Sequence, residues 1–155
     1  MAVSAYIFSN KNNLNYRIYF DTISCVAPIG IFLGRISNFI NGELYGIPTQ
    51  KAWGVIFPNV DSVPRHPSQI YEALLEGALL FFILNTLVFF KKSYFGFISS
   101  VFLVMYGLFR IICEQFREPD AHIGYIFNYF TVGSVLSIMM LLFGFFFLSK
   151  VIHDE

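Results

Sequence analysis

Charged and amide side chains gather at three places in a chain that is otherwise apolar. One group lies in GRISNFINGELYG, residues 34–46, at the end of an apolar run. A second opens the next apolar run, and a third ends the run after that. The groups are Arg35, Asn38, Asn41 and Glu43; His66, Ser68, Gln69, Glu72 and Glu76; and Arg110, Glu114, Gln115 and Arg117. Arginine carries a planar fork of donors that grips phosphate or carboxylate, so these groups are suited to an anionic ligand.

The surroundings of these groups are unusually hydrophobic. Of the 155 residues, 56% are hydrophobic and 13% are charged. Soluble domains average about 25% charged residues. Mean hydropathy is +0.63, and the chain contains 20 Phe and 9 Tyr. This composition excludes an ordinary soluble domain, and the length allows a single domain over residues 1–155 in which lipid is the solvent for much of the surface.

Four stretches are long enough to cross the bilayer as helices, which takes about 20 residues for roughly 30 Å of hydrocarbon. They cover residues 21–41, 69–90, 94–116 and 125–149. These runs lack the alternating pattern of membrane β-strands and are too long for such strands. The sequence therefore predicts an all-α, polytopic bundle of about four transmembrane helices.

Two further segments complete the expected architecture. AVSAYIF is apolar but too short to span, and it lacks the basic region and cleavage site of a signal peptide, so residues 1–10 read as the remnant of a helix. Residues 46–68 form a loop, because four prolines interrupt any long helix. Trp53, Ile56 and Phe57 give this loop an apolar side, which places it against the lipid headgroups.

The orientation of the bundle is not decided by counting basic residues, because each side carries five. Arg35 and Arg110 fall inside predicted spans, where a role in the protein explains them. Setting them aside makes the lysine-rich side, which holds both termini, the cytoplasmic one. The polar groups and the loop are then expected on the outer face.

The polar groups can be interpreted as structural or as functional. Arginines near helix ends can simply reach the interface with their charged heads. Residues 36–42 after Arg35 are uncharged, however, so Arg35 is expected to face an interior cavity. Arg110, Glu114 and Arg117 are spaced i, i+4, i+7, which predicts one charged helix face. At that depth an anionic lipid headgroup is the expected ligand, while Glu76 is open to either a structural or a functional reading.

Metal and redox chemistry are not indicated. Cys25 and Cys113 both fall inside predicted spans without paired spacing, so they are expected to be small buried residues. His66, His122 and His153 are far apart in the sequence and form no ligand pair on a helix face. We predict no metal and no cofactor.

Three long motifs, GRISNFINGELYG, RHPSQIYEALLEG and RIICEQFREPDAHIGY, resemble the signatures of bacterial prolipoprotein diacylglyceryl transferases in order and spacing. The loop stretch WGVIFP agrees, and the resemblance runs from about residue 21 to the last span. It implies transfer of the diacylglyceryl group of phosphatidylglycerol to the lipobox cysteine of a preprolipoprotein, with release of glycerol phosphate. It also implies a multi-pass protein of the bacterial inner membrane whose active face is periplasmic.

The same resemblance implies roles for individual residues. Catalytic roles fall to Arg35, Glu43, Arg110 and Glu114. Binding of phosphatidylglycerol falls to Arg35, Asn38, Gly46, His66, Arg110 and Arg117.

The chain also departs from the family. Members resemble a bundle of seven transmembrane helices, whose earlier helices bear a His-Gly-Gly type motif thought to activate the thiol. The present sequence lacks that motif, so it resembles the C-terminal part of the enzyme, and we expect activity to require a separately encoded N-terminal fragment. Two alternatives remain, an inactive fragment and a small channel or transporter. The channel is disfavoured because the charges gather at one face and line no path across the bilayer.

Overall fold

A computed structural model of the protein describes residues 2–12, 15–90, 95–119 and 131–153. Its elements are α1 (Ala2–Lys11), α2 (Tyr16–Asn41), α3 (Ser68–Glu72), the π-helix η1 (Ala73–Leu79), α4 (Leu80–Phe90), α5 (Phe97–Glu114) and α6 (Val132–His153). The described residues contain no strand, which confirms the predicted all-α class.

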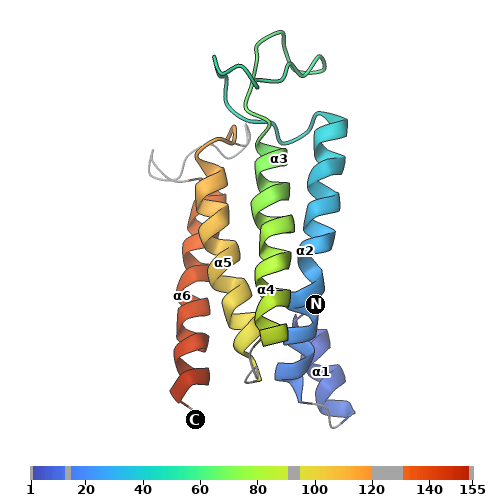
Figure 1. The fold of residues 1–155 in the computed structure, drawn as a ribbon, viewed down its shortest axis with the longest axis vertical. Helices are drawn as coiled ribbons and strands as arrows, with labels where there is room; N and C mark the ends of the chain where they lie inside the picture. Colours follow the sequence, from blue (N-terminus) through green and yellow to red (C-terminus); the bar gives the residue numbers. More distant parts are fainter. Residues whose placement is uncertain (1, 13–14, 91–94, 120–130, 154–155) are drawn as a thin grey trace.

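Four rods in the described part are long and apolar enough to cross a membrane: α2, the continuous rod α3–η1–α4, α5 and α6. They stand side by side, with the loop that joins α2 to α3 at one end (Figure 1). The short α1 and the end of α6 lie toward the other end of the bundle (Figure 1). The protein is thus a membrane protein with its long polar loop on one side.

The helix limits differ from the expected spans for local reasons. α2 begins before residue 21, at Tyr16, because the side chain of Asn15 accepts a hydrogen bond from the N–H of Arg17 and caps the helix. α5 begins after Gly96, which has a φ of 93°. α6 continues past residue 149 to His153, while residues 125–130 of its expected start lie outside the described residues.

α5 ends at Glu114, two residues before the expected limit. The prediction that Arg110, Glu114 and Arg117 share one helix face is therefore wrong for Arg117. The chain turns after Glu114, and Arg117 pairs with Gly46 of the loop as an isolated β-bridge.

Glycines let the rods approach closely. A Cβ on Gly107 of α5 would lie 2.9 Å from the carbonyl oxygen of Ser137 in α6, and one on Gly77 would lie 2.9 Å from Cα of Phe32 in α2. Small residues at helix contacts are the usual means of packing in lipid. Buried apolar side chains fill the interior of the bundle, among them Leu80, Leu84 and Ile98.

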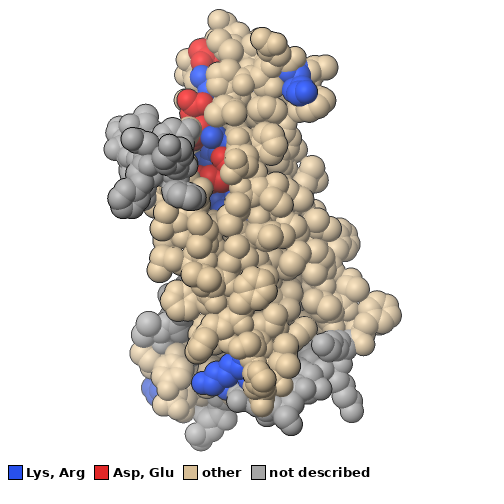
Figure 2. Space-filling view, turned by 90° about the vertical axis from the view of Figure 1, so that its left-hand side faces the viewer, with Lys and Arg blue, Asp and Glu red and all other residues tan. Residues whose placement is uncertain are grey.

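Large apolar side chains cover the outside of the rods. Phe82, Phe89 and Leu142 are 65%, 88% and 65% exposed, and uncharged surface forms a broad belt across the face shown in Figure 2. In water such a surface would drive aggregation, whereas in a bilayer it faces lipid.

The loop after α2 is held by short backbone pairings. Gly42 ends α2 with a φ of 70°. Beyond it, the N–H of Gly46 donates to His66 O at 3.0 Å, and Arg65 exchanges two hydrogen bonds with Val55 at 2.9 Å each. The Arg65 guanidinium donates to Asp61, which holds the pKa of that carboxyl below its usual value, and also contacts Glu118 at 3.2 Å. These contacts join the loop to the segment that follows α5.

Candidate functional site

Three arginines from distant parts of the chain meet at one carboxylate at the loop end of the bundle. Glu72, the last residue of α3, places Oε2 2.9 Å from Nε of Arg35 on α2. Its Oε1 lies 2.6 Å from Nη1 of Arg110 on α5 and 3.7 Å from Nη1 of Arg117. The Glu72 side chain is fully buried. One buried carboxylate therefore organises all three guanidinium groups.

A second carboxylate lies one turn further along the same rod, inside η1. Glu76 is also fully buried, with Oε2 3.5 Å from Nη2 of Arg35 and Oε1 3.4 Å from Nη1 of Arg110. π-Helical turns are rare and recur at functional sites. Here the π-helix carries the second acid of the cluster.

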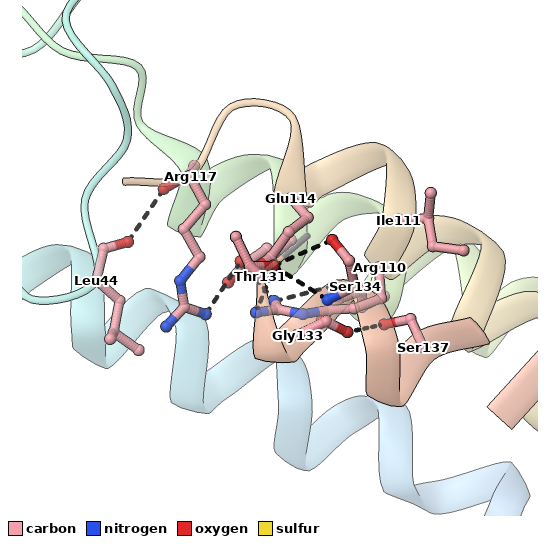
Figure 3. A network of polar contacts seen from close by, with 12 residues as sticks. Leu44, Arg110, Ile111, Glu114, Arg117, Thr131, Gly133, Ser134 and Ser137 are labelled. Carbon is pink, nitrogen blue, oxygen red and sulfur yellow. Dashed lines mark hydrogen bonds and ion pairs between the residues drawn. The ribbon is translucent and has the colours of Figure 1, made fainter. Parts of the chain in front are cut away.

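Glu114 forms the third acidic corner, where α5 ends and α6 begins. Its Oε2 lies 3.1 Å from Nη2 of Arg110, and the hydroxyl of Thr131 donates to its Oε1 at 2.6 Å. Thr131 also accepts a hydrogen bond from the N–H of Ser134 at 3.1 Å, which makes it the cap of α6 (Figure 3). A Cβ on Gly133 would lie 2.6 Å from Glu114 Oε1, so the glycine leaves room for the carboxylate. The positive end of the α6 dipole favours an acid at this position.

We call this group the Arg–Glu cluster. Its members are Arg35, Glu72, Glu76, Arg110, Glu114 and Arg117. Three arginines and three glutamates give it no formal net charge. Among the described residues, Glu72 Oε2, Glu76 Oε2 and Glu114 Oε2 are buried without a well-aligned hydrogen bond, so ion pairing holds them.

Charges at this depth carry a desolvation penalty that apolar side chains would avoid. A buried ionic cluster in membrane-spanning helices is therefore a functional site by default. Figure 2 shows acidic and basic atoms in a column on one face, running from the loop end toward the apolar belt. Charged atoms are thus exposed on this face near the loop, although Glu72 and Glu76 themselves are fully buried.

A groove borders the cluster at Arg35. It has a volume of about 220 Å³ and is lined by Gly30, Ile31, Gly34, Arg35, Asn38 and Tyr106. Two of the predicted site residues, Arg35 and Asn38, therefore face one groove whose remaining lining is mostly apolar. Such a lining suits a ligand with a charged head and an apolar body.

The structure brings together most of the predicted site residues. Arg35, Arg110, Glu114 and Arg117 are in the Arg–Glu cluster, and Asn38 lines the adjoining groove. Glu43 has an exposed side chain that makes no ion pair with the described members of the cluster, while its carbonyl accepts a hydrogen bond from Gln69 at 2.6 Å.

Gly46 and His66 lie where the loop crosses the end of α5. A Cβ on Gly46 would collide with the carbonyl oxygens of His66 and Phe116. The His66 ring packs on Phe116, and its Nδ1 lies 3.0 Å from the Tyr71 hydroxyl, which also accepts a hydrogen bond from Trp53. The structure gives both residues contacts that hold the loop, and their predicted part in lipid binding remains a prediction.

The roles assigned from the sequence did not include Glu72, Glu76 or Thr131, although Glu72 and Glu76 belonged to the second polar group and a functional reading of Glu76 was left open. Glu72 and Glu76 carried a signal, because two acids four residues apart interrupt an apolar run inside the second motif. Thr131 carried none, since its contact with Glu114 arises only when α6 packs against α5.

The comparisons with known proteins agree with the three motifs. A family model described as prolipoprotein diacylglyceryl transferase matches residues 1–150. The chain belongs to the prolipoprotein diacylglyceryl transferase family. It is similar to proteins named phosphatidylglycerol–prolipoprotein diacylglyceryl transferase, with 52% identity to that of Rickettsia felis, 53% to that of Rickettsia typhi and 51% to that of Rickettsia bellii.

The match covers most of this chain and only part of each relative. The aligned residues make up 92% of the chain and 56% of the Rickettsia felis transferase, and 96% and 57% for the Rickettsia bellii protein. The chain therefore spans a little over half the length of these transferases. Within that span the first transferase motif supplies Arg35 and Asn38, the second supplies Glu72 and Glu76, and the third supplies the remaining members of the Arg–Glu cluster.

Proposed function

We propose that this chain takes part in moving the diacylglyceryl group of phosphatidylglycerol to the lipobox cysteine of a preprolipoprotein, and that the Arg–Glu cluster binds the phosphate. The observation that carries this proposal is the meeting of Arg35, Arg110 and Arg117 on Glu72 at one end of the membrane helices. A phosphodiester headgroup is the anion available at that depth, and its acyl chains stay in the lipid beside the groove.

The reaction breaks the bond between a glyceryl carbon and a phosphate oxygen, and it forms a thioether bond from that carbon to sulfur. Negative charge grows on the departing phosphate. Arginine donors already held in place by buried acids stabilise that charge without reorganising. Arg35, at the groove, is the arginine best placed to meet the phosphate, with Asn38 beside it. Glycerol phosphate then leaves toward the loop side.

The thiol must also lose its proton, since thiolate is the nucleophile and a free thiol has a pKa of about 8.5. Glu114 is engaged by Arg110 and Thr131, and His66 is engaged by Tyr71. We propose that a separately encoded N-terminal fragment, corresponding to the part of the transferases that this chain does not span, supplies the base. Alone, the chain would then have little or no transferase activity.

The proposed location is the bacterial inner membrane, with the loop and the Arg–Glu cluster on the periplasmic side, where preprolipoproteins present the cysteine. Trp53 and Ile56 of the loop are 59% and 51% exposed, which suits contact with headgroups. An inactive fragment is the competing proposal. A channel has less support, because the buried charged residues of the described helices, Glu72, Glu76 and Arg110, all belong to the Arg–Glu cluster and line no path across the bilayer.

The test is rescue of a bacterial strain depleted of its own transferase. We expect the full chain to rescue growth when co-expressed with the N-terminal part of the Rickettsia felis transferase, and Arg35→Ala to lower rescue and in vitro release of glycerol phosphate at least about 100-fold, as loss of a charge-stabilising donor does. Lys51→Ala, an exposed loop residue, is the matched control that keeps activity.

Two results would contradict the proposal. Absence of rescue despite stable co-expression of both parts would favour an inactive fragment. Release of glycerol phosphate by the purified chain alone, dependent on a lipobox peptide, would show that no N-terminal fragment is needed.

A further inference from the structure

The two buried glutamates of the α3–η1–α4 rod hold the arginines unequally. Arg35 lies 2.9 Å from Glu72 through Nε and 3.5 Å from Glu76 through Nη2. Arg110 Nη1 lies 2.6 Å from Glu72 and 3.4 Å from Glu76. Charge-assisted N–H···O bonds span about 2.7–2.9 Å. Glu72 is therefore the close partner of both arginines, and Glu76 is the distant partner of both.

The weaker contact lies on the side chain that borders the groove. Arg35 lines the 220 Å³ groove together with Asn38, and its Nε is engaged by Glu72. Its Nη2 has the 3.5 Å contact with Glu76, whose Oε2 is buried and accepts no well-aligned hydrogen bond among the described residues. Of the two ion pairs that Arg35 makes with the described residues, the one between Nη2 and Glu76 is thus the one that a ligand in the groove can replace at the lowest cost.

Charge balance makes such a recruitment necessary. The Arg–Glu cluster has three positive and three negative groups, so an anion that enters it adds an uncompensated charge unless it takes over contacts from a carboxylate. An uncompensated charge in a partly desolvated site is costly. Between Glu72 and Glu76, Glu76 has the longer contacts with Arg35 and Arg110, so replacing it by the anion loses the least ion-pair energy.

We propose that Glu76 is a resident counter-anion whose ion pairs with Arg35 and Arg110 are exchanged for the phosphate of an anionic ligand, while Glu72 keeps the arginines in place. The inference rests on the proposed function for the identity of that ligand as a lipid headgroup. Glu76 is a positioning residue in this account, because it acts through the arginines and does not touch the reacting atoms.

The experiment compares two substitutions that remove the same charge one turn apart. Glu76→Gln and Glu72→Gln are made in the full chain, in nanodiscs of zwitterionic lipid. Binding of short-chain phosphatidylglycerol, and separately of free glycerol phosphate, is measured by native mass spectrometry, and unfolding temperature is measured in parallel. Glu118→Gln is the control, because it removes a partly exposed carboxylate that pairs with Arg65 outside the cluster.

We expect Glu76→Gln to tighten phosphatidylglycerol binding roughly tenfold, since it removes a competing charge from the arginines. Glu72→Gln should lower the unfolding temperature without tightening binding, because the arginines lose their shared anchor. Glu118→Gln should leave binding unchanged. The apolar lining of the groove predicts that the lipid binds more tightly than free glycerol phosphate, and the reverse order would identify a soluble phosphate as the ligand to be exchanged.

The outcomes separate this inference from the proposed function. If Glu76→Gln binds phosphatidylglycerol no more tightly than wild type, or if Glu76→Gln and Glu72→Gln tighten binding equally, the proposed exchange is wrong. The proposed function still stands in that case, provided that the wild-type chain binds phosphatidylglycerol. If Glu76→Gln binds phosphatidylglycerol or glycerol phosphate and the wild-type chain binds neither, the result supports the exchange. The same result counts against the proposed function of the chain by itself. Absence of binding in every variant overturns both.

Discussion

At the scale of single residues, burial decides what each polar group of the motifs does. Arg110 is 8% exposed and forms ion pairs with three glutamates, which fix the position of its side chain. Removing one member of such a buried set costs about 3–5 kcal/mol, because the remaining charges lose their partners. Glu43 lies in the same motif as Arg35, yet its side chain is exposed. Proximity in sequence therefore did not predict proximity in the site.

Gly46 offers a residue-scale test. Gly46→Ala puts a Cβ against the carbonyl oxygens of His66 and Phe116, so the loop must shift away from the segment that carries Arg117. We expect the free energy of unfolding to fall by about 1–3 kcal/mol, the usual cost of overpacking. Thermal unfolding in detergent measures it.

The matched substitution is Gly30→Ala in α2, where a Cβ meets nothing within 4 Å. Alanine is favoured over glycine inside a helix by roughly 0.8–1 kcal/mol, so this variant should be as stable as wild type or more so. Equal losses at both positions would rule out steric crowding as the reason for glycine at position 46.

At the scale of elements, the rods are joined by polar contacts at their ends as well as by packing. Asp21 on α2 accepts hydrogen bonds from the N–H groups of Gly96 at 2.7 Å and Ser99 at 2.8 Å. The first N–H groups of a helix have no partner within the helix. A carboxylate from α2 thus caps the start of α5, across more than 70 positions of sequence.

Asp21→Ala should lower the free energy of unfolding by about 1–3 kcal/mol, because two N–H groups lose their acceptor. Hydrogen exchange at the first turn of α5 should quicken with it. The neighbouring Thr22→Ala is the control, since Thr22 is exposed and its side chain, within the described residues, donates a hydrogen bond only to Ile18 of its own helix. Unchanged exchange in Asp21→Ala would show that water replaces the cap.

At the scale of the whole molecule, the Arg–Glu cluster lies at the loop end, opposite α1 and the end of α6 (Figure 1). Under the proposed function, the loop faces the periplasm and Lys150 faces the cytoplasm.

Labelling of introduced cysteines tests this topology. In intact cells, Lys51→Cys in the exposed loop should react with a membrane-impermeant maleimide, and Lys150→Cys should react only after the inner membrane is opened. Background should be low, because Cys113 is buried and Cys25 is half-buried within a spanning helix. Labelling of Lys150→Cys alone in intact cells would reverse the proposed orientation.

Sequence by itself determined the features that depend on local composition. The four apolar stretches, the proline-interrupted loop and the polar groups at three run ends follow from hydropathy and from backbone restrictions, which act over a few residues. Arg35 was also expected to face an interior cavity, because residues 36–42 after it are uncharged. In the structure it pairs with Glu72 and lines a groove. The family followed from the three motifs, which the matching family model bears out.

Only the tertiary structure decided how these groups combine. Glu72 acts as the shared partner of three arginines because α2, α3 and α5 converge there, and glycines such as Gly77 let the rods come close enough. Arg117 does not lie on the α5 helix face, because the helix ends at Glu114 and Arg117 pairs with Gly46 of the loop. An ion pair at about 3 Å requires that the packing of separate helices bring two side chains together. Local sequence patterns do not determine the distance between residues on different helices.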